Sequence, residues 1–242
     1  MPKFQAELLP LLAFGAHPDD LEFACGGVIA KETQLGRKVH FVICSRGEAG
    51  TSGTPAQRVT EAENSAALLG ATIEFIELDG DAHLEIRAAH AIKLAGIIRR
   101  VKPGLVLAPT LVENQHPDHW RLGRLVGDAA RLARYGGVSE IRDMAVHAIE
   151  QLLYYAVTPE AEPRDVTPLL IDVSAPEILS KWKESMEAHL SQTSARNYVE
   201  RQLSRARFNG LRAGVEYASA LFSNDALLID SLGILQRGTR HF

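Results

Sequence analysis

Residues 8–20 read LLPLLAFGAHPDD and pass directly from an apolar run into a polar cluster. The run at 8–14 predicts a buried strand that ends at Gly15, and Pro10 moves the start of that strand to the later residues. The next segment, CGGVIAKETQLG (25–36), has apolar residues at helical spacing and ends on Gly36, as expected just after a helix. A strand that leads into a helix is the opening unit of an α/β fold.

The same alternation continues along the chain. Further strands are predicted at 38–45, 72–78, 105–109, 152–157 and 169–173, and further helices at 54–70, 88–101, 117–135, 176–190 and 197–213. This order predicts a Rossmann-like, doubly wound, mostly parallel sheet with right-handed crossovers. We expect one domain over residues 1–242, with a regular core at 1–136 and a C-terminal elaboration of strands and helices at 137–242.

The composition excludes several classes of protein. The 242 residues are 46% hydrophobic and 23% charged, which rules out a disordered or coiled-coil chain. A formal net charge of −4 gives no broad positive field for nucleic acid or an anionic membrane. No run of about 18 apolar residues occurs, and the N-terminal residues lack a signal-peptide pattern. With Cys25 and Cys44 as the two cysteines, we expect buried thiols, no disulfide framework and a cytoplasmic location.

Two polar clusters follow two of the predicted strands. AHPDD (16–20) comes directly after the first strand, and HPDH (116–119) comes a short loop after the strand at 105–109, where a helix begins. In a sheet with the strand order 3-2-1-4, the first and fourth strands are neighbours. Both clusters then emerge in the crevice at which open α/β sheets bind ligands.

Together the clusters contain the ligand set of a catalytic zinc site. His17, Asp20 and His119 offer two imidazoles and one carboxylate, which leaves a fourth coordination position for water. The same donors also suit Fe²⁺ or another divalent ion. Asp19 lies beside a ligand and is not needed as one, so we expect it to act as the general base for the attacking water.

His116 and Asp118 are expected to support the same reaction. His116 lies three residues before His119, where it can donate to an oxyanion and later protonate the leaving amine. Asp118 can hold His116 in one tautomer and favour its charged form. One His-Pro-Asp segment is commonly turn chemistry, but two of them, each after a parallel strand, are not explained by turns alone.

Other site types are not indicated. No G-x-G-x-x-G opens a helix, and neither a Walker A sequence nor a G-x-S-x-G elbow occurs. The pair Gly26-Gly27 is interpreted as a packing device, and Tyr154 and Tyr155 as strand packing. The remaining histidines are expected to lie at the surface or in structural contacts: His40, His83, His90, His147, His189 and His241.

The AHPDD and HPDH motifs together resemble the LmbE-like (PIG-L) zinc-dependent deacetylases. The likeness extends from about Leu12 to about Asp230. It implies a Rossmann-like fold and the same roles for the two motifs: three zinc ligands, a catalytic base, an imidazole that stabilises the tetrahedral intermediate, and an acid that supports this imidazole.

Within that family, the chain looks most like the N-acetylglucosaminyl malate deacetylases of bacillithiol biosynthesis. The segments TPAQRVTEA (54–62), EAHLSQ (187–192) and NYVERQLSRARFNG (197–210) resemble them. This likeness implies that Arg58 engages the substrate, that Tyr198 is a mobile tyrosine near the mouth of the site, and that the protein is a homo-oligomer such as a hexamer. The loop LDGDAHL (78–84) departs from the family pattern: His83 is an unusual insertion, and either Asp79 or Asp81, with Asp81 as the candidate, contacts the sugar.

The sequence therefore predicts a zinc-dependent hydrolase that removes the acetyl group from a small-molecule substrate, an N-acetylglucosamine-type sugar conjugate. One alternative is an amidase that cleaves thiol conjugates of related sugars. Another is a non-catalytic zinc- or sugar-binding protein, against which the presence of both Asp19 and His116 argues, because binding alone needs neither.

Overall fold

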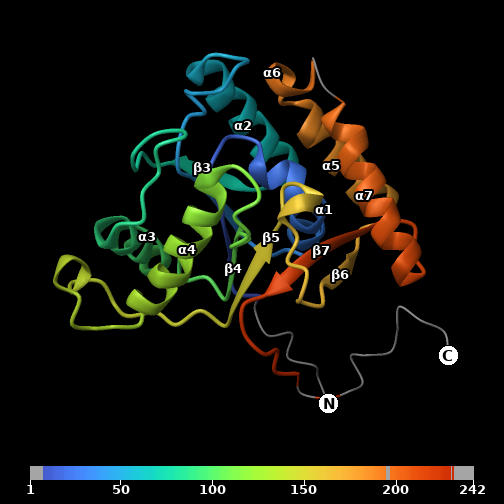
Figure 1. The fold of residues 1–242 in the computed structure, drawn as a ribbon. Coiled ribbons are helices and arrows are strands. Elements are labelled where there is room, and N and C mark those ends of the chain that lie inside the picture. Colours follow the sequence, from blue (N-terminus) through green and yellow to red (C-terminus); the bar gives the residue numbers. More distant parts are fainter. Residues whose placement is uncertain (1–7, 195–196, 230, 232–242) are drawn as a thin grey trace.

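The chain is described by a computed structural model that covers residues 8–194, 197–229 and 231, and it is built around a central sheet (Figure 1). Seven strands of this sheet lie in the order β3-β2-β1-β4-β5-β7-β6. The strands are β1 (Leu11–Gly15), β2 (Val39–Ile43), β3 (Thr72–Phe75), β4 (Leu105–Pro109), β5 (Gln151–Tyr155), β6 (Leu169–Asp172) and β7 (Ala218–Ser223).

The first five strands are mutually parallel, and the last two, β6 and β7, form the antiparallel edge of the sheet. β1 pairs with both β2 and β4, while β7 pairs antiparallel with β5 and with β6. The predicted mostly parallel α/β sheet is thus confirmed, including the neighbouring positions of the first and fourth strands. The sequence did not predict β7, because the short run ASALFS lacks the β-branched residues that mark a strand.

Helices cover both faces of the sheet. They are α1 (Asp20–Gln34), α2 (Pro55–Leu69), α3 (Ala88–Val101), α4 (Pro117–Leu132), α5 (Pro176–Glu187), α6 (Leu190–Thr193) and α7 (Tyr198–Ala213), with short 3-10 turns at Ser139–Ile141 and Pro159–Ala161. Alternate residues of β1 separate the two cores: Leu12 and Phe14 pack towards α3 and α4, whereas Leu11 and Ala13 pack towards α1, α2 and α5. In Figure 1 the pair α3 and α4 lies on the opposite side of the sheet from α5 and α7.

Most helix ends follow the sequence signals. The Thr54 hydroxyl oxygen accepts a hydrogen bond from the Gln57 N–H at the start of α2, and Gly70 ends this helix with a φ of 74°. α1 begins at Asp20, five residues before the predicted Cys25, because the Asp20 carboxylate accepts from the backbone N–H groups of Ala16 and His17 and closes the preceding turn. The helix predicted at 176–190 is two helices, α5 and α6.

The pair Gly26-Gly27 gives α5 close access to α1. A Cβ atom on Gly26 would lie 2.5 Å from the Trp182 ring, and one on Gly27 would lie 3.0 Å from it. The indole N–H of Trp182 donates to the Glu22 carbonyl oxygen at 2.7 Å. These contacts fix the helix that follows the AHPDD cluster against the C-terminal part of the chain.

The sheet order brings the two clusters to one edge. β1 and β4 pair side by side, so the loops at their carboxyl ends open into the same crevice. None of the helices among the described residues is both long and apolar enough to cross a membrane.

Candidate active site and metal centre

A pocket of about 420 Å³ lies at this edge of the sheet. Its floor contains residues of both clusters, and its walls come from the loop at 45–53, the loop at 76–87 and the helices α6 and α7. The two distant segments therefore meet in one cavity, as the strand order requires.

Side-chain atoms of three residues at the floor of the pocket surround a common point. His17 Nδ1 lies 3.1 Å from His119 Nε2, Asp20 Oδ1 lies 3.0 Å from His119 Nε2, and Asp20 Oδ2 lies 3.6 Å from His17 Nδ1. Ligands about 2.0–2.1 Å from a tetrahedral metal are about 3.3 Å from one another. The separations therefore fit a single bound cation, with the fourth direction open to the pocket.

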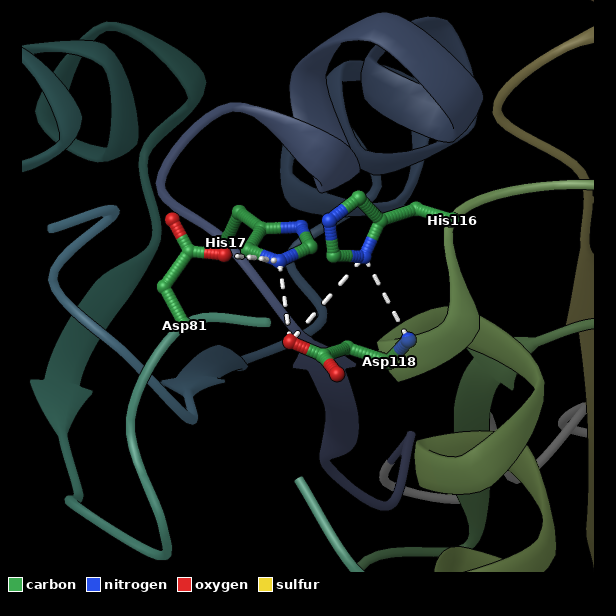
Figure 2. A group of neighbouring side chains, drawn as sticks. All are labelled: His17, Asp81, His116 and Asp118. Carbon is green, nitrogen blue, oxygen red and sulfur yellow. Dashed lines mark hydrogen bonds and ion pairs between the residues drawn. The ribbon is translucent and has the colours of Figure 1, made fainter. Parts of the chain in front are cut away.

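The second nitrogen of each imidazole faces an acceptor. His17 Nε2 lies 3.1 Å from Asp81 Oδ1 and 3.4 Å from Asp118 Oδ2 (Figure 2). His119 Nδ1 lies 3.2 Å from Gln115 Oε1. Acceptors at these positions keep the proton on the far nitrogen and leave the near nitrogen unprotonated, as a metal ligand must be.

The charges at the floor of the pocket stabilise a positive charge there. Burial raises the pKa of Asp20, but His119 and His17 outweigh it and hold the pKa of this carboxyl well below its usual value. Burial conversely lowers the pKa of His17, but Asp20, Asp118 and Asp81 raise it well above its usual value. An excess of buried carboxylate stabilises either a proton on the imidazole or a metal ion in its place.

A second group of donors lies beside the first and shares His17. Asp81 and Asp118 face Nε2 of this imidazole, and the His116 ring lies beside the His17 ring (Figure 2). The Asp81 carboxylate also accepts from the Ala49 N–H at 3.1 Å, and the Asp118 carboxylate accepts from the Ala82 N–H at 2.7 Å. These oxygens already accept from backbone N–H groups and face His17. Asp81 and Asp118 therefore fit the role of residues that orient the metal ligand His17 better than the role of ligands in a second metal centre.

Asp19 is held in a strained position at the edge of the same floor. Its φ is 131°, a backbone conformation that residues other than glycine rarely adopt. The Arg58 guanidinium donates to Asp19 Oδ2 at 3.2 Å, to the Pro18 carbonyl oxygen at 3.0 Å and to the Gly47 carbonyl oxygen at 3.1 Å. Burial, partly offset by Arg58, raises the pKa of Asp19 to about 6, which suits a group that must take and release a proton.

His116 caps α4 and presents its other nitrogen away from the helix. Its Nδ1 accepts from the Asp118 backbone N–H at 3.3 Å, so the neutral ring carries its proton on Nε2. Burial and the imidazoles of His17 and His119 lower the pKa of His116, although Asp118 and Asp81 act in the opposite direction. The net shift is thus opposite to the one expected from Asp118 alone, and His116 is a neutral donor near pH 7.

The structure separates the two carboxylates of the loop LDGDAHL. Asp81 lines the pocket, whereas Asp79 accepts from the Glu85 N–H and pairs with Arg87 and with His90 in the first turn of α3. His83 lies exposed.

The other two residues predicted to meet the substrate also line the pocket. Arg58 does so with Nη1 and Nη2 donating to protein oxygens, and Tyr198 packs its ring 5.6 Å from the ring of Phe23. Their contacts with a substrate stay predictions.

Most of the other histidines make structural contacts. His40 lies between Thr72 and Glu74, His90 faces the Glu85 carbonyl oxygen, and His147 lies 2.7 Å from the Pro103 carbonyl oxygen. His241 lies outside the described residues. Cys25 and Cys44 are free and buried, and Tyr155 donates to the Phe14 carbonyl oxygen within the sheet.

Sequence reasoning missed several residues of the site. Gln115 stands four residues before His119 and holds its ring, a spacing that could have drawn attention to it. Arg201 and Gln192 line the pocket from α7 and α6; both lie in the segments 197–210 and 187–192 that carry the subfamily resemblance, but were not named as site residues. His189, expected in an ordinary contact, is fully buried and lies 3.4 Å from the buried carboxylate of Glu22.

Comparison with known proteins finds matches to the segment that contains both clusters. The family model for PIG-L, described as GlcNAc-PI de-N-acetylase, matches residues 12–130, which include both clusters. The diacetylchitobiose deacetylase of Thermococcus kodakarensis is 30% identical over 158 residues, which are 60% of this chain and 59% of that protein. The 4-oxalmesaconate hydratase of Pseudomonas putida is 32% identical over 138 residues, which are 52% of this chain and 53% of that protein. The chain thus spans less than two thirds of either relative.

The fold likeness extends further along the chain. The conserved protein TT1542 of Thermus thermophilus matches with a TM-score of 0.81 and 29% sequence identity, over 92% of this chain and 97% of that one. The chain therefore resembles the PIG-L family over the segment that contains both clusters, and it shares its fold with TT1542.

Proposed function

We propose that the protein is a metal-dependent N-deacetylase that hydrolyses the acetamide group of an N-acetyl amino-sugar conjugate. The observation that best supports this is the triangle formed by His17 Nδ1, one Asp20 oxygen and His119 Nε2, with Asp19 next to it in the chain. The family match and the diacetylchitobiose deacetylase relative favour the same chemistry.

Zn²⁺ fits the two imidazoles and one carboxylate, and Fe²⁺ fits the same donors. A divalent ion at this point supplies a Lewis acid that polarises an amide carbonyl and makes water more acidic. His17, Asp20 and His119 would hold it, with Asp81, Asp118 and Gln115 fixing the rings of the two histidines.

The remaining groups move protons. Asp19 takes a proton from the water that attacks the carbonyl carbon. His116 donates from Nε2 to the oxygen on which negative charge develops. With a pKa of about 6, Asp19 then returns the proton to the sugar nitrogen as the C–N bond breaks, which gives acetate and a free amine.

N-acetylglucosaminyl malate is the substrate that we propose within this class. Its carboxylates require a cation, and Arg201 stands at the pocket, half-exposed, with Glu160 3.6 Å away as a loose partner. A loose, exposed ion pair costs little to exchange for a ligand carboxylate. The sugar would then lie between the floor of the pocket and α7, with its acid group towards Arg201.

A hydratase acting on a carboxylate is a second candidate, because the Pseudomonas relative bears that name. A carboxylate next to the reacting atoms would need a free cation deep in the pocket. Arg58 lies there, but its guanidinium already faces Asp19 and two backbone carbonyl oxygens. The described part of the pocket therefore favours the deacetylase.

Release of acetate tests the proposal. The purified protein is incubated with N-acetylglucosaminyl malate, N-acetylglucosamine, diacetylchitobiose and a thiol-sugar conjugate, with and without removal of metal by a chelator. We expect acetate from at least one N-acetyl sugar, loss of activity after chelation and recovery on addition of Zn²⁺ or Fe²⁺. Activity that survives complete metal removal, or metal-loaded protein that releases no acetate, contradicts the proposal.

We further propose a homo-oligomer in the cytoplasm. The family resemblance suggests the assembly, and two free, buried cysteines suit a reducing compartment. Light scattering after size-exclusion chromatography gives the number of subunits, and a monomeric mass refutes the assembly.

A further inference from the structure

The short helix α6 forms part of the pocket wall through Gln192. The Gln192 Nε2 group donates to the Ser52 carbonyl oxygen at 2.9 Å and lies 3.0 Å from the Ser191 hydroxyl oxygen. A carbonyl oxygen can only accept, so the amide must turn its nitrogen towards Ser52. Gln192 lines the pocket, so its carbonyl oxygen, Oε1, is the polar atom of this side chain that remains for a ligand.

Buried groups fix the segment that holds this amide. Glu61 of α2 accepts from the Ser191 backbone N–H at 2.9 Å and from the Ser191 hydroxyl at 2.6 Å. Because the hydroxyl gives its proton to Glu61, it must accept from Gln192. One residue before α6, the fully buried His189 ring contacts Glu22.

The amide therefore enters the pocket with its orientation already set. Both N–H bonds of Gln192 have acceptors, and Oε1 has no hydrogen-bond partner among the described residues. A fixed acceptor in a pocket recognises a donor of the ligand, and it discriminates strongly against an analogue that lacks the donor. A sugar presents such donors as hydroxyl groups.

We propose that Gln192 Oε1 accepts a hydrogen bond from one hydroxyl group of the substrate and so selects for a sugar. This inference rests on the proposed function in that the ligand is a hydroxylated amino sugar. Ser191 is then a positioning residue that acts through Gln192.

The test crosses enzyme variants with substrates that each lack one hydroxyl group. Gln192→Met removes the amide with little change of shape, Gln192→Leu is a second variant in case the first does not fold, and Ser191→Ala removes the acceptor for Nε2. Gln34→Met is the matched control, because this glutamine is exposed at the end of α1 and bonds Glu177. We measure kcat and KM of the metal-loaded enzyme for the parent N-acetylglucosaminide and for each deoxy analogue. Binding of the amine product to each variant is measured separately by NMR.

Gln192→Met is expected to lower kcat/KM for the parent sugar about 5- to 100-fold, the effect of one lost hydrogen bond that leaves a partner unpaired. One deoxy analogue should lose a similar factor with the wild type and nothing further with Gln192→Met. Ser191→Ala should reduce the discrimination against that same analogue, and Gln34→Met should behave as the wild type.

The outcomes distinguish this inference from the proposed function. Acetate release with no change in hydroxyl discrimination on replacing Gln192 overturns the inference and leaves the deacetylase. Absence of acetate release from every sugar, together with product binding that weakens in Gln192→Met, overturns the deacetylase and supports the hydroxyl contact. Equal product binding by the wild type and Gln192→Met counts against the contact in either case.

Discussion

Replacement of Gln115 by leucine should weaken metal binding without removing a ligand. Gln115 Oε1 lies 3.2 Å from His119 Nδ1, and its amide nitrogen donates to the carbonyl oxygens of Thr110 at 3.2 Å and Val112 at 2.9 Å. These two carbonyl acceptors fix the amide so that its oxygen faces the ring. In Gln115→Leu the buried N–H of His119 loses this acceptor, and the ring is free to turn or to exchange its proton.

The expected size of the effect follows from that single contact. Loss of an outer partner of a metal-bound histidine lowers the affinity about 10- to 100-fold. This is about 1.4–2.7 kcal/mol of binding free energy, within the range for one buried group left unpaired.

Competition with a fluorescent zinc chelator measures the dissociation constant of the wild type, Gln115→Leu and the control Gln34→Leu. The melting temperature of each metal-free protein shows whether the loop at 110–116 stays folded. We expect a roughly 10- to 100-fold weaker affinity for Gln115→Leu alone. Equal affinities of the three folded proteins would refute the role assigned to Gln115 and the assignment of His119 Nε2 as a ligand atom.

Three further substitutions test Asp19 as the base, Arg58 as the residue that holds it, and the buried pair of His189 and Glu22. Asp19→Asn should lower kcat about 100- to 10,000-fold while one metal ion per chain still binds, as measured by turnover and metal analysis; full activity would exclude Asp19 as the base. Arg58→Lys should lower both kcat and the free energy of unfolding, the latter by about 1–3 kcal/mol, because one ammonium cannot reach the three oxygens that the guanidinium serves; a fully stable and active variant contradicts this. His189→Gln should cost more unfolding free energy at pH below about 6.5 than in mild alkali. Burial lowers the pKa of His189, but Glu22, Asp19 and Glu61 raise it above its usual value, so the charged ring stabilises the fold at low pH and this contribution is lost as the pH rises through the raised pKa. Denaturant titrations of metal-free protein across pH decide this, and a cost independent of pH would contradict it.

The sheet could be predicted because its signals are local. Gly70 and Thr54 mark the ends of α2, and the continuous apolar run from Leu11 to Phe14 matches a strand buried on both faces. The strand order then brings the AHPDD and HPDH clusters together, so the residues of the candidate metal centre could be named from the chain alone.

The contacts that orient those residues could not be predicted. Asp81 faces His17 across 64 positions of sequence, and this contact depends on the path of the loop at 76–87. Likewise, Arg58 reads as an exposed helix residue until the folded loop at 45–53 covers it: a Cβ on Gly47 would lie 2.0 Å from its guanidinium. The His189–Glu22 pair depends on how α5 and α6 pack on α1, which no local pattern encodes.

The most direct test of the account is an anomalous-difference map from crystals of zinc-loaded protein. The account predicts one strong peak about 2.0–2.2 Å from His17 Nδ1, an Asp20 carboxylate oxygen and His119 Nε2. A peak among Asp81, His116 and Asp118 instead, or active crystals with no peak near His17, would contradict it.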